Sequence, residues 1–257
     1  MRGFTWRSFP PKTSRAFVQS QTSSHSSNSA VTGFSVFGGL ALNLPVGGLN
    51  IHAVRTAIEL GAREIWMPTI HAASFIDKAS HVPALSRTLK ERLEGIRITD
   101  KEGRLLPELV PILEAIAEAD IILGTGHISK EEAFVLVKAA KEVGVKKILI
   151  THPMAAFLGY SVDDMKRMTD AGAYLDHCYI FATKAVAQQI PVSQMAQIIK
   201  ETDIGMTVLS SDGGQTINPP PVEMFSHFVN DLLKEGLDIS DIDRMTIENP
   251  AKLLGLD

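Results

Sequence analysis

Three histidines and one aspartate follow short apolar runs in the second half of the chain, where their side chains could bind a metal ion or exchange a proton. They are His127, His152, His177 and Asp212. The apolar runs are typical of buried β-strands, and helical patterns separate them. The four side chains arrive 25, 25 and 35 residues apart, which suits one strand and one helix per step. Because the carboxyl ends of parallel strands share one rim, we expect these side chains to converge there.

Two imidazoles and a carboxylate form a ligand set typical of catalytic zinc sites, with one position left for water. His127, His152 and Asp212 could supply this set. A divalent ion lowers the pKa of its water and polarises a carbonyl or phosphoryl group, so Asp212 needs only to accept a proton. A structural alternative stays open for each residue. The histidines could be loop or capping hydrogen-bonders, and Asp212 could cap the turn at Gly213–Gly214.

Four further side chains at the expected rim are predicted to contact substrate. Asn43 and His71 follow the two earlier apolar runs, Gln215 follows Asp212, and His177 ends the third run of the core. Side chains alternate along a strand, so only one of Asp176 and His177 can face the interior of a barrel. The single cysteine, Cys178, follows His177 directly and is interpreted as a small core residue.

The elements that must position these residues suggest an α/β fold, a TIM-like barrel that is distorted or incomplete. A closed barrel of this type needs eight strands, and the sequence offers no good candidate for the eighth. Residues 72–104 are interpreted as an irregular insertion with a helical piece near residues 85–93 and a small hairpin at its end. Seven strands are predicted, namely Arg2–Trp6, Phe34–Leu42, Glu64–Thr69, Asp120–Thr125, Lys147–Thr151, Ala173–Cys178 and Met206–Ser211.

Residues 1–33 differ from the rest of the chain, which we assign to one barrel domain over residues 34–257. No acidic residue occurs before Glu59, and residues 19–28 are almost all Ser, Thr, Gln and Asn. One interpretation is an organelle transit peptide. Another is a barrel strand followed by a polar loop, which is expected to be mobile. A cloning or gene-model artefact is the third.

Composition limits the classes of function. A formal net charge of −4 gives no support for nucleic-acid binding, and no apolar run is long enough to span a membrane. One cysteine fits a reducing compartment. We therefore expect a cytoplasmic protein that acts on a small molecule, with a mitochondrial location as the lesser alternative. An open barrel seam would leave apolar edges, which favours a homodimer.

The strand ends resemble those of a known family. Gly126–His127, the sequence Thr-His-Pro at 151–153, Ser-Ser-Asp at 210–212 and a closing Asn-Pro-Ala-Lys-Leu-Leu-Gly at 249–255 are similar to motifs of the amidohydrolase superfamily of metal-dependent hydrolases. Further stretches, such as Trp66–Thr69, resemble an uncharacterised branch of that superfamily. The resemblance implies a distorted (β/α)8 barrel with one or two divalent metals. It implies that His127 and His152 match the metal ligands of the fifth and sixth strands, and that Asp212 matches the aspartate of the eighth.

The chain also departs from the superfamily pattern. A His-x-His pair on the first strand usually holds one metal, and this chain contains no such pair. No Lys or Glu follows the strand at residues 64–69 to bridge two metals, although His71 could stand in. A single-metal site, a barrel without metal and a truncated gene product stay open.

We therefore expect a metal-dependent hydrolase, with zinc as the first choice of metal and manganese as an alternative, acting on an amide, lactone or ester. The alternative is a catalytically impaired barrel with a binding or structural role. A Rossmann-type dinucleotide enzyme is disfavoured, because Gly124-Thr125-Gly126-His127 is not followed by the third glycine of the Gly-x-Gly-x-x-Gly motif.

Overall fold

The computed structural model describes residues 35–79 and 94–256 of the chain. Within these residues six parallel strands form one sheet, and each strand pairs with the next along the chain. Sequential parallel order, with a connection packed on one face after each strand, is the topology of a (β/α) barrel. In the part of the chain that the structure describes, β6 does not pair with β1 and the sheet stays open. The strands are β1 (Gly39–Ala41), β2 (Glu64–Trp66), β3 (Ile122–Gly124), β4 (Ile148–Ile150), β5 (Tyr174–Cys178) and β6 (Thr207–Ser210).

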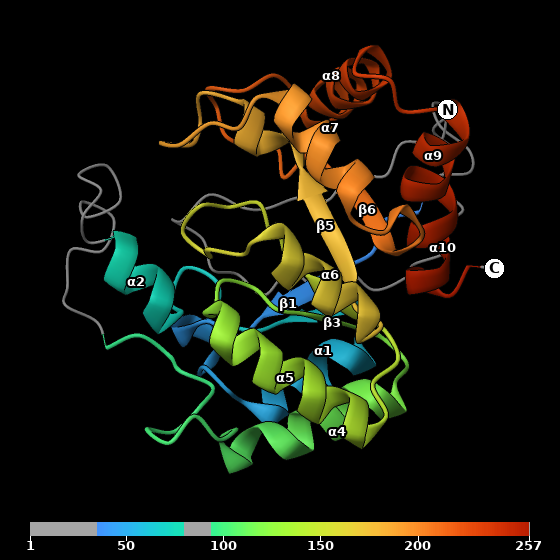
Figure 1. Ribbon diagram of the computed structural model, residues 1–257. Helices are drawn as coiled ribbons and strands as arrows, with labels where there is room; N and C mark the ends of the chain where they lie inside the picture. Colours follow the sequence, from blue (N-terminus) through green and yellow to red (C-terminus); the bar gives the residue numbers. More distant parts are fainter. Residues whose placement is uncertain (1–34, 80–93, 257) are drawn as a thin grey trace.

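Helices connect the strands and cover one face of the sheet. Figure 1 shows the order of the chain in the colours, from the blue and green helices α1, α4 and α5 to the orange and red helices α7, α8 and α10. The helices that follow the strands are α1 (Ile51–Glu59), α2 (Ala73–Ala79), α4 (Val110–Glu118), α5 (Lys130–Val143), α6 (Val162–Asp170), α7 (Val192–Glu201) and α8 (Pro221–Lys234). Short 3-10 turns are η1 (Leu44–Val46), η2 (Pro107–Leu109), η3 (Tyr179–Ala182) and η4 (Ile204–Met206).

Strand register divides the side chains between two faces of the sheet. Paired residues of parallel strands point to the same side, and successive residues point to opposite sides. Ile65, Leu123, Leu175 and Leu209 belong to the large core that includes residues of the covering helices, so they lie on the outer face. The other set faces the interior of the open barrel, which we call the lumen. It comprises Gly39, Ala41, Glu64, Trp66, Ile122, Gly124, Leu149, Tyr174, Asp176, Cys178, Val208 and Ser210.

The C-terminal helices fill one end of the lumen. Leu253 and Leu254 of α10 (Asn249–Leu254) are buried against the lumen residues Ile122, Leu149 and Val208. The buried Asn249 starts this helix, and its Nδ2 donates to the carbonyls of Ile204 and Thr207 at 3.0 and 2.7 Å. These bonds hold α10 at the beginning of β6. The apolar helix therefore fills the end of the lumen where the strands begin, and the polar end lies where the strands finish. Between α8 and α10 lie α9 (Ile239–Asp243) and the π-helical η5 (Arg244–Glu248).

Capping residues begin the two helices that follow the central strands. Ser129 and Glu132 form a reciprocal capping box at α5, and Ser161 and Asp164 form one at α6. Each such cap satisfies backbone N–H groups that the helix leaves unpaired and is worth about 1 kcal/mol. The Glu132 carboxylate also accepts the N–H of Ile98 at 2.9 Å. The start of α5 is therefore fixed against the stretch that precedes α4.

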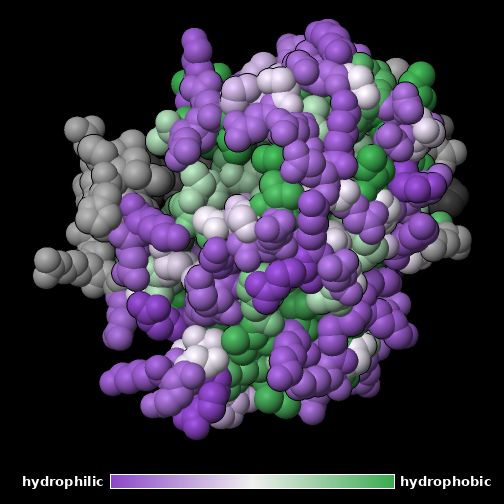
Figure 2. All heavy atoms as spheres, in the orientation of Figure 1, coloured by the Kyte–Doolittle hydropathy of each residue, from purple (hydrophilic) through white to green (hydrophobic). Residues whose placement is uncertain are grey.

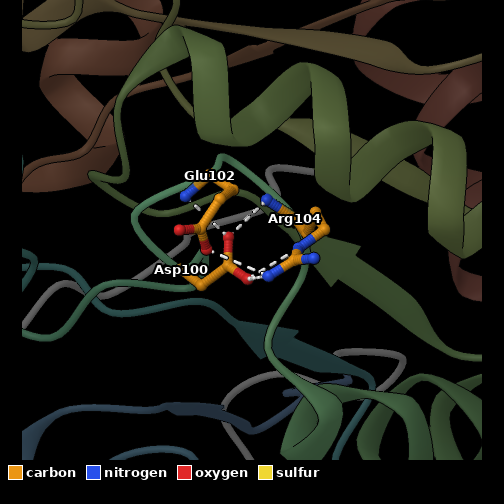
Figure 3. A network of polar contacts seen from close by, with 3 residues as sticks. All are labelled: Asp100, Glu102 and Arg104. Atoms are coloured by element: carbon orange, nitrogen blue, oxygen red, sulfur yellow. Dashed lines mark hydrogen bonds and ion pairs between the residues drawn. The ribbon is translucent and has the colours of Figure 1, made fainter.

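The predicted hairpin near residue 100 is confirmed. Thr99 and Leu105 form an antiparallel bridge, and Gly103 has a φ of 77° in the turn. Asp100 accepts the N–H groups of Glu102 and Arg104 at 3.0 and 2.9 Å, and its second oxygen accepts Nε of Arg104 at 2.9 Å (Figure 3). These bonds, led by the backbone N–H of Arg104, lower the pKa of Asp100. The turn is exposed, so its ion pairs fix local shape more than overall stability.

The structure confirms the predicted α/β class and the incomplete barrel, with six of the seven predicted strands at the expected places. The seventh, Arg2–Trp6, lies outside the described residues, as do the atypical segment 1–33 and the helical piece near residues 85–93. Helix α2 was not predicted, because residues 72–104 show no clear helical period. The face in Figure 2 is mostly hydrophilic, with smaller apolar areas between. Among the described residues no helix has the length and apolarity needed to cross a membrane.

Candidate functional site

His127 and His152 face each other at the polar end of the lumen. The two Nε2 atoms are 3.1 Å apart, and the ring centroids are 4.9 Å apart with the planes at 48°. The rings come from the loops that follow β3 and β4, at the carboxyl ends of neighbouring strands. The structure therefore brings together two of the three residues predicted to bind metal, with the same ring nitrogen of each pointing at one place.

Tight contacts between neighbouring strand ends fix the two histidines. The backbone N–H of Gly126 donates to Thr151 Oγ1, and the N–H of Thr151 donates to Thr125 Oγ1, both at 3.0 Å. Gly126 has a φ of 58°, and a Cβ there would lie 2.4 Å from the carbonyl oxygen of Met67. Only glycine fits this position. The next residue, His127, donates its N–H to Pro68 O at 2.9 Å, so its backbone is held against the end of β2.

Backbone strain is concentrated at the predicted site. Among the described residues, three that are not glycine have a positive φ: Asp120 at 49°, His152 at 32° and Asp212 at 44°. Such conformations cost of order 1–3 kcal/mol and are often found at functional sites. Asp120 lies before β3 and forms an ion pair with Lys147 at 2.9 Å, at the opposite end of the strands. The other two are both predicted site residues.

Three phenylalanines surround the histidine pair. Phe75 lies 4.8 Å and Phe157 5.2 Å from the His127 ring, and Phe157 and Phe181 lie 5.8 and 5.3 Å from the His152 ring. Helix α2 supplies Phe75, and its Ser74 Oγ donates to the carbonyl of His127 at 2.6 Å. Lys78, also on α2, donates to the carbonyl of Phe157. The unpredicted helix therefore covers the pair from one side.

Burial keeps both imidazoles neutral near pH 7. Desolvation lowers the pKa of His127 well below 6.5, and the neighbouring His152 lowers it further, against a smaller opposing effect of the Thr69 backbone. Desolvation also lowers the pKa of His152, against a smaller opposing effect of the Asp212 carboxylate. A neutral imidazole has a free lone pair on one ring nitrogen, which is the form that binds metal ions.

The pair fits two adjacent ligand positions of a divalent ion. Two metal–nitrogen bonds of roughly 2.0–2.1 Å at a tetrahedral angle place the nitrogens about 3.3–3.4 Å apart, close to the observed 3.1 Å. The Asp212 carboxylate is close enough to His152 for its charge to oppose the lowering of the His152 pKa. However, no three His, Cys, Asp or Glu side chains lie close enough to share an ion in residues 35–79 and 94–256. The described site therefore offers two ligands in place and a third group nearby.

Nδ1 of each histidine has no hydrogen bond of good geometry. Ligating histidines usually donate from this nitrogen to a carboxylate, carbonyl or water. For His127 the Thr69 backbone lies close enough to affect the pKa. The two Nε2 atoms are thus in place to bind a metal ion, whereas the hydrogen bonds that usually orient such rings through Nδ1 are missing.

Asn43 forms hydrogen bonds with the loop that follows β2, and Gln215 forms hydrogen bonds within its own loop. Nδ2 of Asn43 donates to Thr69 Oγ1 at 2.7 Å, and its Oδ1 accepts the N–H groups of Thr69 and His71 at 3.0 and 3.2 Å. Nε2 of Gln215 donates to the carbonyl of Asp212 at 3.0 Å, and its Oε1 accepts from Asn218. Both side chains position rim loops in this structure. The predicted contact with substrate stays a prediction for each.

His71 lies at the rim, half-buried, and desolvation lowers its pKa. Its Nδ1 has no hydrogen-bond partner. No three-residue cluster of metal-capable groups includes it within the described chain. Its predicted contact with substrate, and its possible role in place of a bridging ligand, stay predictions.

The structure places Asp176, and not His177, in the lumen. His177 pairs in register with Leu209, whose side chain belongs to the core shared with the helices. His177 is fully buried, neither ring nitrogen has a hydrogen-bond partner, and desolvation lowers its pKa to about 3. Asp176 is partly exposed. Cys178 Sγ lies 3.4 Å from Asp176 Oδ2 and accepts from Ser210 Oγ at 3.1 Å.

Sequence reasoning missed two groups of residues that shape the site. The phenylalanines around the histidines come from three loops or helices far apart in sequence, and no local pattern marks them. Glu64 also faces the lumen, where it is 1% exposed and desolvation, followed by the charge of Asp176, raises its pKa well above 4.5. An acidic residue beginning an otherwise apolar strand is a signal that could have found it.

Comparison with known proteins assigns the sequence to a family. Residues 13–176 match the model of a family of unknown function, DUF6282. This match covers more than half of the chain. The chain belongs to DUF6282. The matched part of this DUF6282 protein includes His127 and His152 and ends before Asp212. No protein of curated function matches the sequence significantly.

Solved structures share the fold of the DUF6282 chain at low identity. The probable dipeptidase PvdM from Pseudomonas aeruginosa has a TM-score of 0.56 at 12% identity, over 84% of this chain and 67% of that one. A metallo peptidase from Rhodobacter sphaeroides gives 0.56 at 12%, over 84% and 62%. An amidohydrolase from Pseudomonas aeruginosa gives 0.54 at 13%, over 80% and 67%. These neighbours confirm the resemblance to amidohydrolases at the level of the fold, and this chain spans about two thirds of their length.

Proposed function

We propose that this protein is a metal-dependent hydrolase that cleaves an amide, ester or lactone bond of a small molecule, with His127 and His152 as metal ligands. The observation that carries the proposal is the approach of the two Nε2 atoms to 3.1 Å, at the carboxyl ends of adjacent parallel strands. Zinc is the first choice for a site with two imidazoles, and manganese is the alternative.

Each residue of the site has a defined task in this proposal. Desolvation keeps His127 and His152 neutral, so that both can present a lone pair. A divalent ion held by these two residues would polarise the scissile carbonyl and lower the pKa of the attacking water. Asp212 accepts the proton of that water as general base. The phenylalanines around the pair exclude bulk water, which strengthens the electrostatic interactions inside the site.

The fold neighbours favour an amide among the candidate bonds. Two of them are named as a probable dipeptidase and a metallo peptidase, the latter liganded with a phosphinate mimic of the dipeptide L-Ala-D-Ala, and the third is named as an amidohydrolase. Their identity to this chain is low, so they support the bond class and not a substrate. A small-molecule partner, a homodimer and a cytoplasmic location are part of the same proposal.

Metal-dependent turnover tests the proposal. The full-length protein is stripped with a chelator, reconstituted with zinc or manganese, and assayed on dipeptides, N-acyl amino acids, esters and lactones. We expect turnover that needs the metal and is lost in His127→Ala but kept in His52→Ala, which removes an exposed histidine on α1. Turnover that is equal with and without metal, or equal in the two variants, contradicts the proposal.

The second candidate is a binding or structural protein with the barrel fold. It is favoured by the lack of a three-ligand cluster in the described part of the chain. In that case the two imidazoles would only hydrogen-bond each other, one donating and one accepting. Metal-stimulated hydrolysis of any substrate in the panel rules this candidate out.

A further inference from the structure

A second polar cluster lies deeper in the lumen than the histidine pair. Glu64 begins β2, Asp176 lies on the inner face of β5, and the charge of Asp176 is close enough to raise the pKa of Glu64. No ion pair or hydrogen bond joins either carboxylate to a lysine or arginine within the described residues. The two acids thus face the same space without a counter-charge.

Glu64 is the unusual member of this cluster. It is 1% exposed, and neither oxygen of its carboxylate has a hydrogen-bond partner. One oxygen of Asp176, Oδ1, also lacks a partner. A buried carboxylate that is not paired destabilises a protein by several kcal/mol unless it is protonated or meets a cation. Such an arrangement is expected where the missing partner is a ligand.

The lumen is shaped around this carboxylate. A Cβ on Gly124 would lie 2.6 Å from Glu64 Oε1 and 2.4 Å from Trp66 Cδ1, and one on Gly39 would lie 2.3 Å from the Trp66 ring. The glycines on the two flanking strands therefore make room for the indole and the carboxylate to lie side by side over the sheet. Trp66, Tyr174 and Asp176 are each partly exposed, whereas Glu64 and Oδ1 of Asp176 are buried.

The chemistry of the cluster selects one kind of ligand. Calcium takes roughly six to eight oxygen ligands, which is more than the carboxylates of Glu64 and Asp176 supply. Three carboxylate oxygens are without partners, namely Glu64 Oε1, Glu64 Oε2 and Asp176 Oδ1. A primary ammonium group has three N–H donors. It also gains a favourable interaction with an aromatic ring beside it.

We propose that Glu64 and Asp176, with Trp66 beside them, form a binding site in the lumen for the protonated primary amino group of the substrate. Strands β2 and β5 point from this site toward the rim, so a substrate enters amine first and leaves its scissile bond near His127 and His152. That the bound amine belongs to a substrate rests on the proposed hydrolase function. The binding of an ammonium group at this site does not depend on that function.

Binding of a simple amine tests the site without any turnover. The chain contains two tryptophans, Trp6 and Trp66, so Trp6→Phe leaves Trp66 as the only indole reporter. Propylammonium is titrated into this protein, with 1-propanol as the neutral match of the same size. We expect a saturable fluorescence change with the amine alone. Equal effects of amine and alcohol, or no saturable change with the amine, overturn the proposal.

Variants locate the site. Glu64→Gln keeps the size of the side chain and removes its charge, and we expect amine affinity to fall about 10-fold or more, since hydrogen bonds to charged groups are the stronger ones. Asp176→Asn should weaken binding in the same direction, and it carries the test if Glu64→Gln does not fold. Glu59→Gln, an exposed control on α1, should leave binding unchanged. Unchanged affinity in the folded Glu64 or Asp176 variant overturns the proposal, as does displacement of propylammonium by one equivalent of Mg²⁺ or Ca²⁺.

Kinetics separate this proposal from the hydrolase proposal. With the metal-reconstituted enzyme, Ala-p-nitroanilide and its N-acetyl derivative differ only in the free amine. We expect Glu64→Gln to raise KM about 10-fold for the free amine alone, with kcat nearly kept. Turnover with no preference for the amine overturns the amine site. Amine binding to a protein that shows no turnover overturns only the hydrolase.

Discussion

The histidine pair at the rim and the carboxylate pair in the lumen are both desolvated, and desolvation shifts the pKa values of the two pairs in opposite directions. Desolvation disfavours the charged form of any group, so it lowers the pKa of His127 and His152 and raises the pKa of Glu64 and Asp176. Neutral imidazoles are ready to bind a cation as they stand. Neutral carboxyls must first lose a proton, and they do so most easily when a cation arrives.

The two regions also differ in how firmly the protein holds their side chains in place. The two rings are held by strand-end hydrogen bonds, by a strained backbone at His152 and by surrounding phenylalanines. The two acids have aromatic neighbours, but neither oxygen of Glu64 and only one oxygen of Asp176, Oδ2, has a partner in the protein. A preorganised first region suits chemistry, whereas an unsatisfied second region suits recognition.

The largest effect is expected from Asp212→Asn in the metal-reconstituted enzyme. The amide cannot accept the proton of the attacking water, so we expect kcat to fall about 10²–10⁴-fold. Steady-state kinetics on the best substrate of the panel measure it, with Asp163→Asn, an exposed carboxylate on α6, as the control. An Asp212→Asn enzyme within threefold of wild type would remove this residue from the chemistry.

Gly124→Ala is expected to give the next largest effect, on stability. Its Cβ would meet both Trp66 and Glu64 at less than 3 Å, and overpacking of this kind costs about 1–3 kcal/mol. Urea unfolding followed by circular dichroism measures the loss. Gly205→Ala is the control, since its Cβ would meet only the carboxylate of Asp203, at 3.0 Å. Equal stability of wild type and Gly124→Ala would contradict the close packing over β3.

Glu64→Met should stabilise the protein in the absence of ligand. Methionine fills a similar volume and removes an unpartnered buried carboxyl, which gains about 1–2 kcal/mol. For a chain of this size that corresponds to a rise in Tm of roughly 2–8 °C. Thermal unfolding at pH 8 measures it, against the exposed Glu59→Met. A lower Tm for Glu64→Met would show that the carboxylate has a partner within the protein.

The smallest effect is a pH dependence. Desolvation raises the pKa of Asp176 from 3.8 to about 7, so its stabilising contribution is full below pH 3.8 and is lost as the pH rises through 7. We therefore expect Asp176→Asn to gain Tm relative to wild type, by a few degrees, between pH 4.5 and pH 8. Parallel Tm curves for the two proteins would show that Asp176 titrates normally.

Much of the fold could be predicted because its signals are local. Apolar runs marked the strands, and Ser129 and Ser161 marked the helix starts through their capping boxes. Gly103 and its neighbours marked the hairpin. Helix α2 could not be predicted in the same way, since its contacts with His127 and Phe157 join parts of the chain far apart in sequence.

The candidate site was predictable in part for the same reason. The place of His127 and His152 follows from their position after neighbouring parallel strands. Which of Asp176 and His177 faces the lumen depends on strand register, because a shift of one residue reverses the faces. The place of Glu64 at the start of an apolar strand could have been noticed in the sequence, but its lack of hydrogen-bond partners depends on what surrounds it in three dimensions.

Zinc stoichiometry tests the central claim most directly. The full-length protein, its His127→Ala and His152→Ala variants and the control His52→Ala are dialysed against buffered zinc, and the bound metal per chain is measured by inductively coupled plasma mass spectrometry. The account predicts about one tightly bound zinc in wild type and in His52→Ala, with affinity reduced more than about 100-fold in the other two. Equal zinc content in all four proteins, or none in any, would contradict it.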